Sequence, residues 1–146
     1  MAFKFHGRKD VGRFLVRLVR EKLEGLAGRF DVIVPLPVTK SRLRERGFNQ
    51  TYVLSEEIGR ITARPIDYRS LVKARETEDQ YTLGRKERRK NIAGAFAVSR
   101  NQDVEGRRVL VVDDLFTTGS TLSEASKTLL AAKAGRVEVF ALARTP

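Results

Sequence analysis

The sequence predicts an α/β fold with a mainly parallel sheet that helices cover on both faces. Two short apolar runs, at residues 31–35 and 109–112, have the length and composition of strands buried on both sides. A helical pattern over residues 10–27 precedes the first run, and another follows the second run and leads to an apolar strand at 137–142. Strands that alternate with helices in this way are typical of parallel α/β sheets.

Length and composition favour one domain over residues 1–146. Hydrophobic residues make up 41% of the chain, which is enough for a single ordinary core. The chain has no cysteine and one histidine, His6, so we expect neither a zinc site nor a His-based triad. No run approaches the ~18 consecutive apolar residues of a membrane span, and the N-terminus lacks a signal-peptide layout, so we expect a cytoplasmic protein.

The excess positive charge lies in the first hundred residues. The formal net charge is +11, and 20 of the 29 basic residues are arginine. Because a guanidinium group matches the geometry of phosphate oxygens, this bias favours a polyanionic partner. A solvated basic surface is an equally good interpretation of the composition alone.

The N-terminal part predicts a helix, a strand and a basic loop. Apolar side chains recur at helical spacing over residues 10–27, with arginines on the other face, and Gly28 is the expected stop. The run at 31–35 is closed by Pro35 and predicts a buried strand. The polar, basic segment 35–48 is predicted to be a loop.

The middle of the chain is less regular. A second helix is predicted to begin at a cap residue, either Asn49 or Thr51. The segment 64–72 has the composition of a short strand. Residues 73–92 form a long polar tract without periodicity, which in a compact domain is typical of a functional lid or of disorder.

The C-terminal third contains the clearest strand, at residues 109–112, which follows a turn at 105–106. Gly135 is expected to end the next helix. The apolar face of that helix is predicted to consist of Leu122, Ala125, Leu129 and Leu130. With the final strand, at 137–142, these elements should form a right-handed crossover unit.

The strongest chemical signal follows the strand at 109–112. Asp113 and Asp114 come directly after it, and ligands of parallel sheets bind beyond the carboxyl ends of strands. Neighbouring carboxylates suit a sugar diol, or Mg²⁺ bound directly or through water. The alternative is that Asp114 only ends a strand.

The turn after the two acids is rich in small hydroxyl residues and leads into a helix. Backbone N–H groups and the positive end of the helix dipole make such a turn a phosphate site. The predicted phosphate turn consists of Thr117, Thr118, Gly119, Ser120 and Thr121. Together with the acids it predicts a site for a ribose 5-phosphate. In the alternative interpretation, Thr117 or Thr118 merely caps the helix.

Three segments resemble a known family. VLVVDDLFTTGST, residues 109–121, resembles the motif of type I phosphoribosyltransferases that binds 5-phosphoribosyl 1-pyrophosphate (PRPP). RLRERGFNQ, residues 42–50, and QYTLGRKERRKNIAGAF, residues 80–96, resemble signatures of the ComF family of competence-associated, phosphoribosyltransferase-like proteins. The similarity covers about residues 31–144. It implies a three-layer type I phosphoribosyltransferase fold with a small hood or flexible loop.

The resemblance also implies site residues. Asp113 and Asp114 would be catalytic, bind the ribose hydroxyls and hold Mg²⁺ with PRPP, and the phosphate turn would hold the 5-phosphate. The flexible loop would be about residues 73–92, with Arg85, Arg88 and Arg89 facing pyrophosphate. The predicted pyrophosphate residues outside this loop are Thr39, Lys40, Arg42 and Arg46.

The function that the resemblance implies is transfer of the 5-phosphoribosyl group of PRPP to an unidentified acceptor, with release of pyrophosphate. The alternative is a protein without turnover that senses PRPP or a nucleotide, or binds single-stranded DNA during uptake in competence. Aromatic residues among basic ones, which could stack on bases, are Phe3, Phe5, Phe48, Tyr52 and Tyr81. Dimers are common in this fold.

Two features depart from the family pattern. ComF proteins often begin with a cysteine-rich zinc ribbon, so this chain is expected to be a short form without that module. Some purine-salvage relatives have an acidic residue at the position of Thr117, which argues against a purine acceptor.

Overall fold

The computed structural model describes residues 9–77 and 84–145. Its centre is a three-stranded parallel sheet in the order β1 (Val32–Pro35), β4 (Arg108–Phe116) and β5 (Arg136–Arg144). Val109 of β4 is aligned with Val32 on one side and with Val137 on the other. The predicted parallel α/β sheet is therefore confirmed, and β4 is its middle strand.

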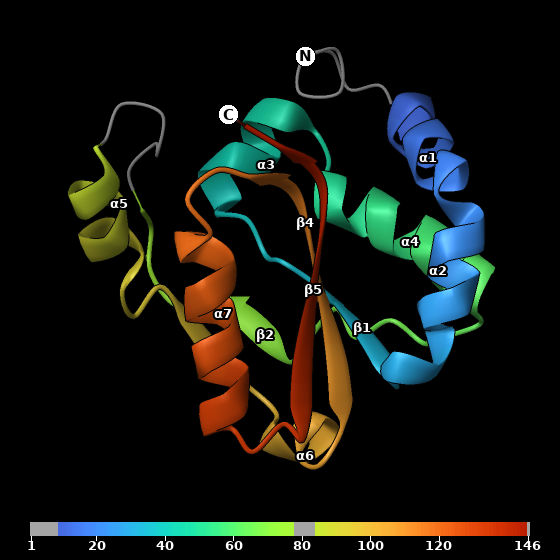
Figure 1. The fold of residues 1–146 in the computed structure, drawn as a ribbon. Coiled ribbons are helices and arrows are strands. Elements are labelled where there is room, and N and C mark those ends of the chain that lie inside the picture. Colours follow the sequence, from blue (N-terminus) through green and yellow to red (C-terminus); the bar gives the residue numbers. More distant parts are fainter. Residues whose placement is uncertain (1–8, 78–83, 146) are drawn as a thin grey trace.

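Helices cover both faces of the sheet (Figure 1). On one side lie α1 (Lys9–Leu18), α2 (Arg20–Leu26) and α4 (Gln50–Thr62), which enclose a core with Ile33, Leu110 and Val112. On the other side lies α7 (Ser120–Ala131), with the antiparallel pair β2 (Leu71–Lys73) and β3 (Phe96–Val98). The core on this side includes Val32, Val34, Val109 and Val111.

Successive residues of β1 and β4 thus point into opposite cores. Because helices cover both faces of the sheet and exclude water, the buried part of each of these strands is apolar at every position rather than at alternate ones. This explains why the runs at 31–35 and 109–112 predicted buried strands correctly. It also fixes the position of Asp113 and Asp114, which directly follow the buried part of β4.

The single helix predicted over residues 10–27 is interrupted in the structure, whereas the second predicted helix is confirmed as α4. The pattern over residues 10–27 is found as α1 and α2, which are separated at Val19, and a 3₁₀ turn at Ala27–Arg29 includes Gly28. Of the two candidate caps of the second helix, the structure selects Asn49. Its side chain accepts a hydrogen bond from the backbone N–H of Thr51 at 2.9 Å.

Two predicted loops contain helices instead. The segment 35–48 includes α3 (Lys40–Arg46), which begins at the cap residue Thr39. The tract 73–92 includes α5 (Arg85–Ile92), while residues 78–83 of that tract lie outside the described residues. Both helices have few buried apolar side chains, because neither packs against the core of the sheet: α3 lies near its carboxyl end, and α5 lies on the outer side of α7 (Figure 1).

Other boundaries also differ from the prediction. The strand expected at 64–72 forms later, as β2, and Ile66 makes only a single bridge to Ile33. Both β3 and the short helix α6 (Asn101–Val104) were missed. Helix α7 ends at Ala131, before Gly135, and Leu130 is 52% exposed rather than part of the apolar face.

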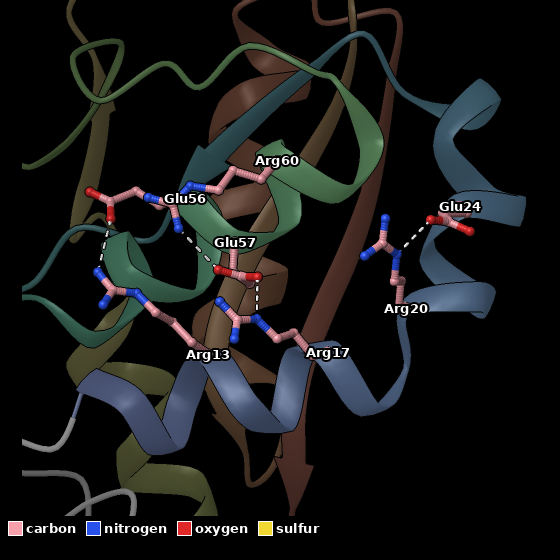
Figure 2. Close-up of polar contacts among 7 residues, drawn as sticks. All are labelled: Arg13, Arg17, Arg20, Glu24, Glu56, Glu57 and Arg60. Carbon is pink, nitrogen blue, oxygen red and sulfur yellow. Dashed lines mark hydrogen bonds and ion pairs between the residues drawn. The ribbon is translucent and has the colours of Figure 1, made fainter.

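Ion pairs join α1 to α4 (Figure 2). The carboxylate of Glu57, whose side chain is 5% exposed, accepts from Arg17 at 2.7 Å and from Arg60 at 3.1 Å. The hydrogen bond from Arg17 is the main reason that the pKa of Glu57 is lowered. Within the described ranges, the helices are all too short or too polar to cross a membrane.

Candidate functional site

The two acids lie at the carboxyl end of the middle strand. Asp113 is buried, and its Oδ1 accepts a hydrogen bond from the backbone N–H of Asp114 at 2.8 Å. Burial raises the pKa of Asp113 well above its ordinary value, and the neighbouring carboxylate of Asp114 raises it further. Negative charge at this position is therefore costly unless a cation or hydrogen-bond donors compensate for it.

The turn between β4 and α7 has a fixed shape that depends on Gly119. This residue has φ +78°, and a Cβ atom there would be 2.7 Å from Cζ of Phe116. The hydroxyls of Thr118 and Ser120 are hydrogen-bonded at 2.8 Å. The predicted phosphate turn is therefore a compact unit at the start of a twelve-residue helix.

A small cavity of about 90 Å³ joins these elements to two distant arginines. Besides apolar residues, its lining consists of Asp113, Asp114, Thr117, Gly119, Thr121, Arg42 and Arg88. Arg42 comes from α3 and Arg88 from α5, so each of the two helices found in predicted loops contributes a cation. We call this the acid–phosphate cavity.

The other half of the predicted phosphate turn lines a separate cavity of about 430 Å³. Thr118 and Ser120 lie there with Arg89 of α5 and Lys127 of α7, and Gly119 lines both cavities. The three arginines predicted for the flexible loop therefore do not lie at one common site. Arg88 faces the acids, Arg89 faces the second cavity, and Arg85 lines neither of the two.

The residues predicted to bind pyrophosphate also differ in where their side chains lie. Thr39 is buried and caps α3, where its Oγ1 accepts from the backbone N–H of Arg42 at 3.3 Å. Arg46 donates to Oε1 of Gln50 at 2.7 Å. Lys40 is exposed at the start of α3. Of these four residues, only Arg42 lines the acid–phosphate cavity.

Lys73 belongs to the same neighbourhood and was not predicted. Its Nζ lies 4.7 Å from the ring centre of Phe96 on the paired strand. Burial is the main cause that lowers its pKa from 10.5 to about 8. The cations Arg42 and Arg75 act in the same direction, and Glu76 and Asp113 act in the opposite one. Its only signal in the sequence was its place at the start of the polar tract.

The donor set limits what metal the site could hold. Among the residues that the structure describes, no group of three or more His, Cys, Asp or Glu side chains converges as a ready-made metal site. Two adjacent carboxylates are nevertheless the partial ligand set that Mg²⁺ uses when water and substrate phosphates complete its shell. The residues present therefore fit Mg²⁺ bound together with a phosphorylated ligand.

A middle strand that ends in an acid pair and a turn at a helix N-terminus is the arrangement in which parallel α/β proteins can bind a ligand beyond the carboxyl ends of their strands. Residues 23–146 match the phosphoribosyl transferase domain family, and the chain belongs to this family. The glutamine PRPP amidotransferase of Bacillus subtilis, solved with ADP and GMP, has the same fold. Its TM-score is 0.58 at 21% identity, over 93% of this chain and 26% of that one.

Sequence relatives narrow the family further. Competence protein F of Haemophilus influenzae is 36% identical over 97% of this chain and 65% of its own length. DNA utilization protein YhgH of Escherichia coli K12 is 34% identical over 97% of this chain and 64% of its own length. These relatives confirm the resemblance to ComF proteins, and the chain spans just under two thirds of their length.

Proposed function

We propose that this chain binds PRPP with Mg²⁺ and transfers the 5-phosphoribosyl group to an acceptor, releasing pyrophosphate. The observation that carries this proposal is the acid–phosphate cavity. In it, an acid pair, a phosphate turn and the guanidinium groups of Arg42 and Arg88 meet from three parts of the chain. This combination matches a ligand with a sugar diol, a 5-phosphate and a strongly anionic leaving group.

Each part of the ligand has a partner. The carboxylates of Asp113 and Asp114 accept hydrogen bonds from the ribose hydroxyls. The phosphate turn holds the 5-phosphate at the N-terminus of α7. Arg42 and Arg88 hold the pyrophosphate through charge-assisted hydrogen bonds. When bound, Mg²⁺ supplies positive charge that neutralises pyrophosphate, and Asp113 and Asp114 are the residues that would hold it.

The transfer exchanges one bond at C1 of the ribose for another. The C1–O bond breaks and its electron pair leaves with pyrophosphate, while a lone pair of the acceptor forms the new bond to C1. The proton of the acceptor passes to solvent. The chain contributes by positioning the ribose, and by placing cations where charge develops on the leaving group.

Calorimetry with PRPP and Mg²⁺ tests this proposal. The double variant Asp113→Asn/Asp114→Asn is compared with Asp103→Asn/Glu105→Gln, which removes the same charge at the opposite end of β4. We expect binding by the wild type and the control, and none by the site variant. Absence of PRPP binding by the wild type would reject the site, and pyrophosphate release with acceptors distinguishes turnover from sensing.

Binding of single-stranded DNA is the second candidate, and the names of the relatives support it. Helix α5 is the matching surface, because Arg85, Lys86, Arg89 and Lys90 are all exposed on it. Among the aromatic candidates, Lys9 lies over the ring of Phe48, and Tyr52 packs edge-on against Tyr68. Phe3, Phe5 and Tyr81 lie outside the described residues.

Labelled oligonucleotides test this second function at low and physiological salt, since phosphate contacts weaken steeply as salt rises. The triple variant Arg85→Ala/Arg88→Ala/Arg89→Ala should bind more weakly. Its control, Arg100→Ala/Arg107→Ala/Lys133→Ala, removes the same charge near the start of β4 and should bind like the wild type. Equal loss in both variants would indicate that net charge alone matters and would reject α5 as the contact surface.

A further inference from the structure

Helix α5 supplies Arg88 to the acid–phosphate cavity, although little of this helix is buried. Ile92 is its buried residue, and Arg88 lies one turn before it on the same face. The helix packs against the outer side of α7 (Figure 1). Because a short helix gains most of its stability from packing, the place of Arg88 depends on the polar contacts that hold α5.

Arg75 makes two of these contacts. Its guanidinium group donates hydrogen bonds to the backbone carbonyls of Asn91 and Ala93, the second at 2.5 Å. Asn91 lies in the last turn of α5, where the carbonyls have no N–H partner within the helix. A cation at this end also interacts favourably with the helix dipole. Arg75 therefore caps the C-terminal end of α5 from another part of the chain.

Two more hydrogen bonds fix the same end of the helix. The backbone N–H of Gly94 donates to Oε1 of Glu124 on α7 at 3.0 Å. The backbone N–H of Ala74, which precedes Arg75, donates to the carbonyl of Ala95 at 2.7 Å. The end of α5 is thus held between α7 and the segment that follows β2.

The residue after Arg75 contacts the other helix that supplies a cation. Oε2 of Glu76 accepts a hydrogen bond from Oγ of Ser41 at 3.2 Å, and Ser41 is hydrogen-bonded to Oγ1 of Thr39 at 3.0 Å. Thr39 caps α3, which carries Arg42. Two consecutive residues after β2 therefore contact the two helices whose arginines line the cavity.

Arg75 itself is exposed, and it does not occur among the described residues that line the cavity. The ribose side of the cavity is formed by the end of β4, the phosphate turn and the start of α7, which the sheet and its core hold in place. Loss of the contacts of Arg75 should therefore affect the side that faces pyrophosphate and spare the ribose side.

We propose that Arg75 is a positioning residue for the leaving group. Its two hydrogen bonds hold the end of α5 so that Arg88 lies on the pyrophosphate side of the acid–phosphate cavity, and Glu76 joins the same segment to α3. This inference rests on the proposed function, because it takes pyrophosphate as the ligand of Arg88. It adds a residue outside the site that determines how tightly the leaving group is held.

The test measures binding by calorimetry in the presence of Mg²⁺, with two probes for the two sides of the cavity. Inorganic pyrophosphate reports on the arginines, and ribose 5-phosphate reports on the acid pair and the phosphate turn. The variants are Arg75→Ala, Arg88→Ala and the double variant. Arg100→Ala is the control, since Arg100 is exposed before α6 and its loss removes the same charge.

We expect Arg75→Ala to weaken pyrophosphate binding at least about tenfold and to leave ribose 5-phosphate binding within about twofold of the wild type. In the Arg88→Ala background the same substitution should have no further effect, because the contact that it positions is already absent. Arg75→Lys keeps the charge but lacks the planar fork that reaches two carbonyls, so it should restore only part of the affinity. Arg100→Ala should bind both probes like the wild type.

Additive losses in the double variant would overturn the inference, because Arg75 would then act through its own charge and not through Arg88. Equal weakening of both probes by Arg75→Ala would also overturn it, since this would indicate general damage to the fold. If Arg75→Ala does not fold, Arg75→Lys with and without Arg88→Ala decides by the same criterion. A wild type that binds neither probe would reject the proposed function, whereas pyrophosphate binding that Arg75→Ala leaves unchanged would reject this inference alone.

Discussion

The backbone N–H of Asp114 donates to Oδ1 of Asp113 at 2.8 Å, so the second acid of the pair helps to orient the first. This bond and a further backbone hydrogen bond from Leu115 only partly compensate the buried carboxylate, whose pKa is raised by burial and by its acidic neighbour. A buried acid whose pKa is raised in this way lowers the stability of the fold, and such groups are typical of functional sites.

Asp113→Asn should change the stability of the fold and the binding of PRPP in opposite directions. The variant removes a buried charge, so we expect it to be more stable than the wild type at pH 7 by roughly 1 kcal/mol, with PRPP binding lost. Because the pKa of Asp113 is raised on folding, the wild type loses stability as pH rises above about 4, and the variant does not. Urea denaturation between pH 4 and 8 measures the gap, and a gap that shrinks with rising pH would contradict the assignment.

Gly119→Ala should damage the phosphate turn. The positive φ of Gly119 and the close ring of Phe116 predict a loss of about 1–2 kcal/mol and weaker PRPP binding. Gly25→Ala is the matched control, because Gly25 lies in α2 with open space around it and alanine favours helices by about 0.5–1 kcal/mol. Thermal unfolding should therefore shift in opposite directions for the two variants.

Glu57→Gln tests the ion pairs between α1 and α4. Loss of the buried carboxylate that Arg17 and Arg60 share should cost about 1–2 kcal/mol in urea denaturation. Glu24→Gln removes the exposed pair with Arg20 in the same region and should cost at most about 0.5 kcal/mol (Figure 2). Equal costs would show that burial of Glu57 adds nothing.

The ion pair between Asp31 and Arg108, in which Nη2 of Arg108 lies 2.7 Å from Oδ1 of Asp31, predicts that the stability of the fold decreases at acid pH. Hydrogen bonds from Arg108 lower the pKa of Asp31 to about 2, from an ordinary value of 3.8. A lowered pKa stabilises the fold above pH 4, and this contribution is lost as pH falls from 4 to 2. Asp31→Asn should therefore be less stable than the wild type at pH 7, and the two unfolding curves should converge by pH 2. If the difference in stability between the wild type and Asp31→Asn did not change with pH, side-chain packing rather than the charge of Asp31 would be its cause.

The sequence predicted the elements that pack on both faces of the sheet, since burial leaves a clear apolar pattern in β1, β4 and α7. It missed α3 and α5 because neither has such a pattern: Leu43 of α3 is 44% exposed, and Ile92 is the buried residue of α5. Thr39 caps α3, and α5 packs against the distant helix α7, and periodicity reveals neither feature.

The candidate site was predictable where it is contiguous in sequence and not where it is assembled by the fold. Asp113, Asp114 and the phosphate turn lie within nine consecutive residues, whereas Arg42 and Lys73 reach this region only through α3 and β2. Exposure along the N-terminal helices was also not predictable. The apolar spacing over residues 10–27 predicted a helix, but it did not reveal that Leu18 would be 66% exposed.

The register of the sheet implies an order of folding. Val109 pairs with Val137 across one helix, but Val32 pairs with Val109 only after most of the chain has been enclosed in a loop. Since longer loops cost more entropy to close, β4, α7 and β5 should associate first and β1 should join later. Leu129→Ala should therefore slow refolding, while Ile33→Val should mainly speed unfolding. The predicted phosphate turn should thus form early, and the segment that carries Arg42 should join later.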